Sequence, residues 1–231
     1  MSWKTAYRSI YYRGAPEPED MVLDPATTAL LVIDIQNTYR TRPDPAALTP
    51  EERERYDAWT PFHERLETVV IPNTRAMLEH CRAIGIECLF ARIACQTHDG
   101  RDRSLSQKKP GWNNLLLPKD EWASQIVDEL APQGDEIVVT KTSDSALTGS
   151  SLRLVLHNLG IDTVMCCGLF TDQCVSSTVR SLADESFDVA VLEDCCAAGS
   201  DELHHKELEI VNMIYCHVMS SAEARAMIAP A

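Results

Sequence analysis

The residue of this sequence best placed for chemistry is Cys174, which lies in the segment 163–180, TVMCCGLFTDQCVSSTVR. An apolar run leads to a glycine and a short polar turn, and then comes a helical pattern whose apolar positions share one face: Val175, Val179 and Leu182. The pattern predicts a strand, a turn and a helix, with the thiol near the first helical turn. Free backbone N–H groups and the helix dipole favour a thiolate there. A cysteine in this position is either a nucleophile or an ordinary buried small residue, and packing is our interpretation of the other eight.

Two further reactive side chains come at the ends of predicted strands. Asp34 lies at the end of the apolar run 28–35, TALLVIDI, and Lys141 directly follows the run 136–140, EIVVT. Carboxyl ends of parallel strands meet at one edge of a sheet, where such folds bind ligands, so we expect both residues to meet Cys174.

That combination has a coherent chemistry. Asp34 can take the thiol proton of Cys174 and return it to a leaving amine, while Lys141 steadies the thiolate and the carboxylate. Backbone N–H groups in the turn before the thiol could receive an oxyanion. The predicted reaction is acyl transfer through a thioester, completed by water. A plain ion pair is the alternative role for Asp34 and Lys141.

The elements that must position these residues alternate between strand and helix. This alternation predicts a three-layer α/β/α sandwich around a mostly parallel, six-stranded, doubly wound sheet. Strands are expected at 28–35, 86–93, 136–140, 163–168, 187–192 and 217–219. Helices are expected at 62–84 (divided or kinked at Pro72 and ended by Gly85), at 121–130, at 151–158, after Cys174 and at 201–215.

The remaining segments are predicted to lie outside this frame. Residues 1–24 are expected to form an N-terminal arm, and 25–231 a single domain. The proline-rich and charged stretch 40–61 is interpreted as an insertion with one short helix and a solvated charge run. The long polar loop 94–117 is expected to wall or cover the site.

Composition limits the class of protein. Of the 231 residues, 45% are hydrophobic and 24% charged, which is typical of an ordinary globular protein, and no apolar run reaches the ~20 residues of a membrane helix. The N-terminus lacks the apolar core of a secretory signal, so we expect a cytoplasmic protein with reduced thiols and no membrane partner. A formal net charge of −14 argues against binding nucleic acid.

Around these positions the sequence resembles the isochorismatase-like cysteine hydrolases, which include nicotinamidases, N-carbamoylsarcosine amidohydrolases, and ureidoacrylate and biuret hydrolases. The matching motifs are LLVIDIQNTY, VVTKTSDSAL, CGLFTDQCVSSTVRSL and VAVLEDCCAA, within a resemblance that spans about 23–219. The resemblance implies a catalytic triad of Asp34, Lys141 and Cys174. It also implies a cis peptide before Phe170, which lets the N–H groups of Phe170 and Cys174 form an oxyanion hole. Members of the family are commonly homodimers or homotetramers, and we expect the same here.

Two departures from the family pattern narrow the prediction. Phe170 stands where many members carry a small residue, so the pocket wall is expected to be tighter or differently shaped. The nicotinamidase subgroup carries a zinc cluster after its second strand, whereas the corresponding loop here, IACQTHDGRDRS, holds His98 alone. We therefore predict no metal and no cofactor. True isochorismatases usually lack the cysteine, so its presence favours C–N hydrolysis.

The sequence thus predicts a metal-independent cysteine amidohydrolase acting on a small amide, with ureido or carbamoyl compounds favoured. The alternatives are an isochorismatase-type hydrolase and a non-catalytic binding or regulatory member of the same fold. His204 and His205 are interpreted as part of a solvated helix face. Residues expected to contact substrate are Gln36, Asn37, Tyr39, Thr171 and Tyr215, although core packing explains the two tyrosines nearly as well.

Overall fold

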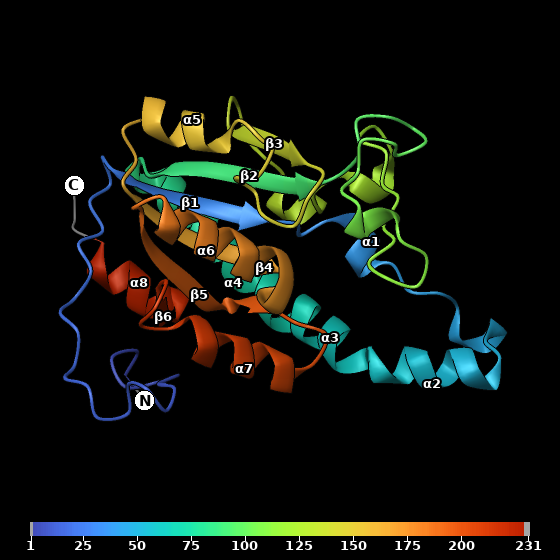
Figure 1. Cartoon of the computed structure of the whole chain (residues 1–231), viewed down its shortest axis with the longest axis horizontal. Coiled ribbons are helices and arrows are strands. Elements are labelled where there is room, and N and C mark those ends of the chain that lie inside the picture. Colours follow the sequence, from blue (N-terminus) through green and yellow to red (C-terminus); the bar gives the residue numbers. More distant parts are fainter. Residues whose placement is uncertain (1, 229–231) are drawn as a thin grey trace.

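A six-stranded parallel sheet organises residues 2–228, the part of the chain that the computed structural model describes (Figure 1). The strands are β1 (Thr28–Ile33), β2 (Glu87–Ile93), β3 (Ile137–Lys141), β4 (Thr163–Leu169), β5 (Asp188–Ala197) and β6 (His217–Met219). Their order is β3-β2-β1-β4-β5-β6, and every pairing is parallel. The central strands β1 and β4 are buried throughout, because helices cover both faces of the sheet.

Helices form the two outer layers, which confirms the predicted three-layer sandwich. Their bounds are α1 (Asn37–Arg40), α2 (Pro50–Ala58), α3 (Thr60–Arg65), α4 (Ile71–Ile84), α5 (Leu152–Asn158), α6 (Ser176–Asp184), α7 (Asp201–Val211) and α8 (Ser221–Met227). Figure 1 shows α6 in front of the sheet and α4 behind it. Right-handed crossovers in this strand order place α5, α6 and α7 on one face and α4 on the other, where α8 packs against α4.

The strand ends that carry the reactive residues are held by close backbone packing. Gly168, near the end of β4, has a φ of 128° and pairs with Ile33 of β1. A Cβ atom added there would lie 1.9 Å from the carbonyl oxygen of Ile33. Only glycine therefore lets β4 approach β1 just before Asp34 and the turn that leads to Cys174.

One predicted helix is wrong. The stretch 121–130 forms two short 3₁₀ turns, Trp122–Ser124 and Asp128–Leu130. Besides the hydrogen bonds of these turns, its backbone pairs with the segment after β1. The carbonyl oxygen of Gln125 accepts from Asn37 N, and Val127 N donates to the carbonyl oxygen of Ile35.

Several predicted boundaries also differ. The fifth strand continues to Ala197 instead of ending at 192, and α7 ends at Val211 instead of 215. The segment before α4 is a π-helical turn, Leu66–Val70, so the long helix divides just before Pro72 and ends as predicted at Gly85, whose φ is 77°. The closing helix α8 has no counterpart in the prediction.

The segment before β1 forms turns. Trp3 is buried edge-on against His217, and its backbone N–H donates to Glu223. Leu23 forms a parallel bridge with Ile228, so the segment that leads into β1 lies beside the end of the described chain. The division of the chain at residue 24 stays a prediction.

The insertion between β1 and α4 projects from the sheet. Figure 1 shows α2 extending away from the rest of the molecule, and none of its residues is buried, as expected for the charge run 51–55. Within residues 2–228, no helix is both long and apolar enough to cross a membrane.

Candidate active site

The structure brings Asp34 and Lys141 into direct contact at the carboxyl edge of the sheet. Lys141 is the last residue of β3 and Asp34 the first after β1, and Lys141 Nζ lies 2.7 Å from Asp34 Oδ2. The exposed fractions of the two side chains are 0% and 1%. Asp34 has a φ of 54°, and its N–H donates to the carbonyl oxygen of Ala91 on β2, which fixes the residue between the strands. Lys141 Nζ also donates to the carbonyl oxygen of Ser143.

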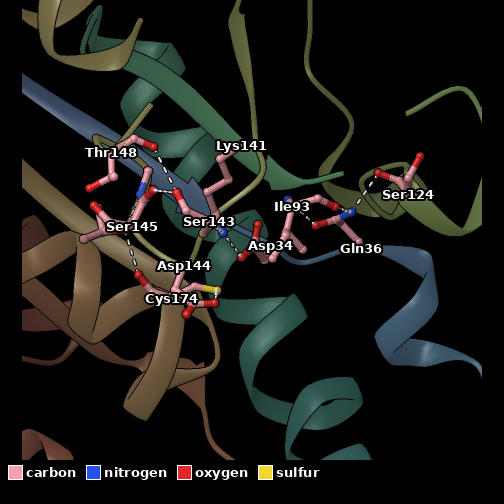
Figure 2. A network of polar contacts seen from close by, with 12 residues as sticks. Asp34, Gln36, Ile93, Ser124, Lys141, Ser143, Asp144, Ser145, Thr148 and Cys174 are labelled. Carbon is pink, nitrogen blue, oxygen red and sulfur yellow. Dashed lines mark hydrogen bonds and ion pairs between the residues drawn. The ribbon is translucent and has the colours of Figure 1, made fainter. Parts of the chain in front are cut away.

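Cys174 lies beside this pair, as predicted. It belongs to the π-helical turn Thr171–Val175 between β4 and α6, and it is 4% exposed. Hydrogen bonding with the thiol lowers the pKa of Asp34 and raises the pKa of Lys141. Figure 2 shows the three side chains reaching one another from separate segments.

Burial and charge set the protonation of the three groups together. Burial raises the pKa of Asp34, and Lys141 only partly offsets this. Burial opposes the Lys141 ammonium, but the negative charges of Asp34 and Cys174 outweigh it and raise the pKa of Lys141. The pKa of Cys174 is raised well above its ordinary value, first by burial and then by Asp34. The single buried ammonium of Lys141 favours one negative charge in the site over two.

This result corrects the expectation of a depressed thiol pKa. The N–H groups of the turn and the helix dipole do not overcome desolvation and the neighbouring carboxylate at Cys174. Loss of the thiol proton to solvent is therefore disfavoured at Cys174.

Asp144 is a fourth reactive group that the sequence interpretation missed. Its Oδ1 lies 3.8 Å from Cys174 Sγ (Figure 2). The available signal was its position three residues after Lys141, in the loop that leaves the same strand end. Asp144 also lines a surface hollow of about 640 Å³, together with Asn113, Asp172, Gln173, Ser176, Ser177 and Arg180. Asn113 comes from the loop 94–117, which therefore contributes to a wall beside the site as expected.

The turn before Cys174 has the backbone form that the resemblance implied. The peptide bond between Leu169 and Phe170 is cis. The N–H groups of Gln173 and Val175 both donate to the carbonyl oxygen of Phe170, at 3.0 and 3.2 Å, and close the turn around the thiol. An oxyanion hole made by the N–H groups of Phe170 and Cys174 stays a prediction.

Four aromatic rings form a group on one side of the site, and Phe170 is at its centre. The Phe170 ring centroid lies 5.0 Å from that of Tyr39, 5.1 Å from Phe62 and 6.0 Å from Trp59. Burial raises the pKa of Tyr39 well above its ordinary value, and the charges of Asp34, Cys174 and Asp144 raise it further. The phenol of Tyr39 therefore lies close to the reactive groups.

Thr171 is fixed by a buried histidine, which corrects the interpretation of His204 as part of a solvated face. His204 is fully buried, whereas His205 is exposed. Arg65 Nη2 lies 2.9 Å from His204 Nε2, and a guanidinium only donates, so Nε2 accepts. The N–H on Nδ1 then donates to Thr171 Oγ1 at 2.8 Å. The missed signal was spacing, because His204 shares the inner face of α7 with Leu208 and Val211.

Gln36 and Asn37 use their amides within the protein. Gln36 exchanges hydrogen bonds with the backbone of Ile93 and donates to the carbonyl oxygen of Ser124. Asn37 Nδ2 donates to the carbonyl oxygen of Trp122. These contacts hold the end of β1 in place, and substrate binding by Gln36 and Asn37 stays a prediction.

Tyr215 is the predicted substrate contact with the most indirect position. It is half-buried and lies under the Arg180 guanidinium, whose carbon is 5.2 Å from the centre of its ring. Arg180 lines the hollow beside Asp144, so Tyr215 contacts a residue of the hollow's lining. Its role as a substrate contact stays a prediction.

The class of protein follows from the fold and this edge of the sheet: a doubly wound α/β protein that gathers a thiol, a carboxylate and an ammonium in one buried site. Comparison with known families then identifies the chain further. Residues 28–223 match the sequence profile of the isochorismatase domain. The chain belongs to the isochorismatase family and is a hydrolase of that family.

Individual relatives agree with this assignment. A ureidoacrylate amidohydrolase RutB from Pseudomonas savastanoi pv. phaseolicola is 31% identical over 198 residues, which cover 80% of this chain and 76% of the relative. A cysteine hydrolase from Pseudomonas syringae pv. phaseolicola has the same fold, with a TM-score of 0.74 at 20% identity, over 90% of this chain and 95% of the other. N-carbamoylsarcosine amidase from Thermoplasma acidophilum superposes with a TM-score of 0.63 at 22% identity, over 84% and 96% of the two chains.

Proposed function

We propose that this hydrolase is a cysteine amidohydrolase that cleaves the C–N bond of a small amide, with ureido and carbamoyl compounds as the favoured class. The observation that carries the proposal is the buried ion pair of Asp34 and Lys141 beside the Cys174 thiol (Figure 2). The names of the relatives support the choice of substrate class, because ureidoacrylate amidohydrolases and N-carbamoylsarcosine amidase both act on carbamoyl nitrogen compounds.

The first half of the reaction forms a thioester. Asp34 accepts the proton of Cys174 as the sulfur attacks the carbonyl carbon of the amide, so a C–S bond forms and the carbonyl oxygen becomes negative. The N–H groups of Phe170 and Cys174 stabilise that oxygen. The C–N bond then breaks, and Asp34 returns the proton to the leaving nitrogen. The positive charge of Lys141 offsets the negative charge of the site while that charge moves between the Asp34 carboxylate and the sulfur.

The second half regenerates the thiol. Water attacks the thioester carbonyl and gives a proton to Asp34, the C–S bond breaks, and the sulfur recovers the proton from Asp34. Each group ends the cycle in its initial state. These steps use only groups of the chain, and we predict activity without added metal or cofactor.

Ammonia release from a panel of small amides and ureides tests the proposal. Cys174→Ala should abolish release while thermal unfolding stays close to that of the wild type. Cys95→Ala is the matched control, because it removes another buried thiol that lies next to Leu117, outside the site. Ammonia release that persists in Cys174→Ala would contradict the role of Cys174 as the nucleophile. A wild-type protein that hydrolyses no member of the panel would favour a non-catalytic binding role or cleavage of a vinyl ether instead.

Homodimer or homotetramer formation is a further proposal from the family resemblance. Light scattering coupled to size-exclusion chromatography tests it, and a mass near the 25.8 kDa of one chain would contradict it.

A further inference from the structure

Asp144 lies beside the predicted nucleophile and at a hollow of the surface. One of its carboxylate oxygens lies 3.8 Å from Cys174 Sγ, and the same side chain lines the hollow of about 640 Å³ beside the site. Cys174 itself is only 4% exposed. A molecule that enters through this hollow to reach the sulfur therefore passes the Asp144 carboxylate.

The loop that carries Asp144 is fixed on both sides of the residue. The carbonyl oxygen of Ser143 accepts from Lys141 Nζ at 3.1 Å. On the other side, Ser145 Oγ lies 2.9 Å from Ser181 Oγ, and Ala146 N donates to Thr178 Oγ1 at 3.0 Å, both on α6 (Figure 2 shows the surrounding contacts). A carboxylate held in this way contributes a fixed charge to the site.

Other charges at the hollow do not cancel the charge of Asp144. The hollow is also lined by Asp172, whose Oδ1 is buried and, within residues 2–228, has no hydrogen-bond partner. Arg180 is the basic residue of the lining, and Glu207 pairs with its Nη1 at 2.8 Å. Behind Asp144, Lys141 is balanced by Asp34. The approach to the sulfur is therefore negative.

We propose that Asp144 is a specificity-determining residue that selects amides and ureides bearing a positive charge and excludes those bearing a carboxylate. The inference rests on the proposed function and narrows its substrate class. An ammonium or guanidinium group at this position gains a fixed counter-charge, whereas a substrate carboxylate meets a like charge in a partly desolvated site. Ureidoacrylate is a carboxylate, so the preferred substrate of this chain differs in charge from that named for its relatives.

A matched set of ureas of similar length tests the proposal by activity. Propylurea is neutral, (2-aminoethyl)urea is cationic, and N-carbamoylglycine is anionic. The wild type should favour the cation over the anion in kcat/KM by about tenfold or more. Asp144→Asn should reduce that ratio by about tenfold, whatever its effect on the neutral substrate. Asp184→Asn, at the exposed end of α6, removes the same net charge and should leave the ratio unchanged. An equal loss on all three substrates in Asp144→Asn would overturn the proposal.

A second experiment reads the charge at the sulfur without any hydrolysis. Methanethiosulfonates with neutral methyl, cationic 2-aminoethyl and anionic 2-sulfonatoethyl groups modify thiols, and mass spectrometry of the peptide containing Cys174 gives the rate for each. Rates are divided by those for free cysteine. The cationic reagent should exceed the anionic one by about tenfold, and Asp144→Asn should remove most of that difference. A ratio near one in the wild type would overturn the proposal. The expected ratio in a protein that hydrolyses no urea would refute the proposed reaction and leave the charge selection in place.

Discussion

Replacing Lys141 with methionine tests whether the ion pair at the centre of the site is desolvated. The change removes the ammonium 2.7 Å from Asp34 and keeps an unbranched side chain. Loss of one partner of a buried pair leaves an uncompensated charge, which costs about 3–5 kcal/mol. Asp34 can avoid part of that cost by binding a proton, because burial already raises its pKa and the loss of Lys141 raises it further.

The direction of the pH dependence follows from this raised pKa. The stability contributed by a protonated Asp34 is complete below its unfolded pKa of about 3.9, and it is lost as the pH rises through the higher folded value. Lys141→Met should therefore lie within about 1–2 kcal/mol of the wild type at pH 5 and about 3–5 kcal/mol below it at pH 8. Urea unfolding at the two pH values gives both differences.

Two further variants make this test specific to burial. Lys119→Met removes a lysine from an exposed pair with Asp120 and should cost less than about 1 kcal/mol at either pH. The double change of Asp34→Asn with Lys141→Met should recover most of the stability at pH 8, because no charge is then left buried. A Lys141→Met protein as stable as the wild type at pH 8, or a loss independent of pH, would refute the reasoning.

Two other predictions concern the backbone and the histidine behind the nucleophile turn. Burial, followed by the charge of Arg65, lowers the pKa of His204 from 6.5 to about 3, so the unfolded chain binds an extra proton between these values. The free energy of unfolding that neutral His204 contributes should be complete above pH 6.5 and fall by at most about 5 kcal/mol towards pH 3. His204→Gln should show a smaller fall in urea unfolding. Equal pH dependence of the free energy of unfolding in the two proteins would contradict the lowered pKa of His204. Gly168→Ala should prevent accumulation of folded protein, because its Cβ would lie 1.9 Å from the Ile33 carbonyl oxygen, whereas Gly14→Ala, with no atom within 4 Å, should fold normally as judged by circular dichroism.

The sheet and the meeting of the three reactive residues could be predicted because both depend on local pattern. Continuous apolar runs predicted all six strands, and the common edge of a parallel sheet predicted that Asp34, Lys141 and Cys174 would lie together. The boundaries were less accurate where tertiary hydrogen bonds decide. The stretch 121–130 has helical spacing, but its backbone groups pair with residues after β1, almost 90 positions earlier.

The protonation of the site and the roles of His204 and Asp144 depend on contacts that local sequence does not contain. His204 is surrounded in sequence by acidic residues and a second histidine, and its two partners are 33 and 139 positions away. The pKa of Cys174 depends on desolvation and on the charges of Asp34, Lys141 and Asp144, which come from other segments. The contact of Asp144 with the sulfur requires the loop conformation after β3, which no periodicity encodes.

The aromatic group around Phe170 comes largely from a different part of the chain than the strand ends that carry Asp34 and Lys141. The reacting atoms are carried by strand ends and the nucleophile turn, whereas three of the four rings, Tyr39, Trp59 and Phe62, come from the segment between β1 and the π-helical turn before α4. Trp59 adjoins helix α2, which has no buried residue, and is itself 40% exposed. Changes of length or composition in this insertion can therefore reshape the space beside Phe170 while the sheet keeps Asp34 and Lys141 in register. Selectivity for substrate shape and the rate of bond cleavage are thus open to independent variation within one fold.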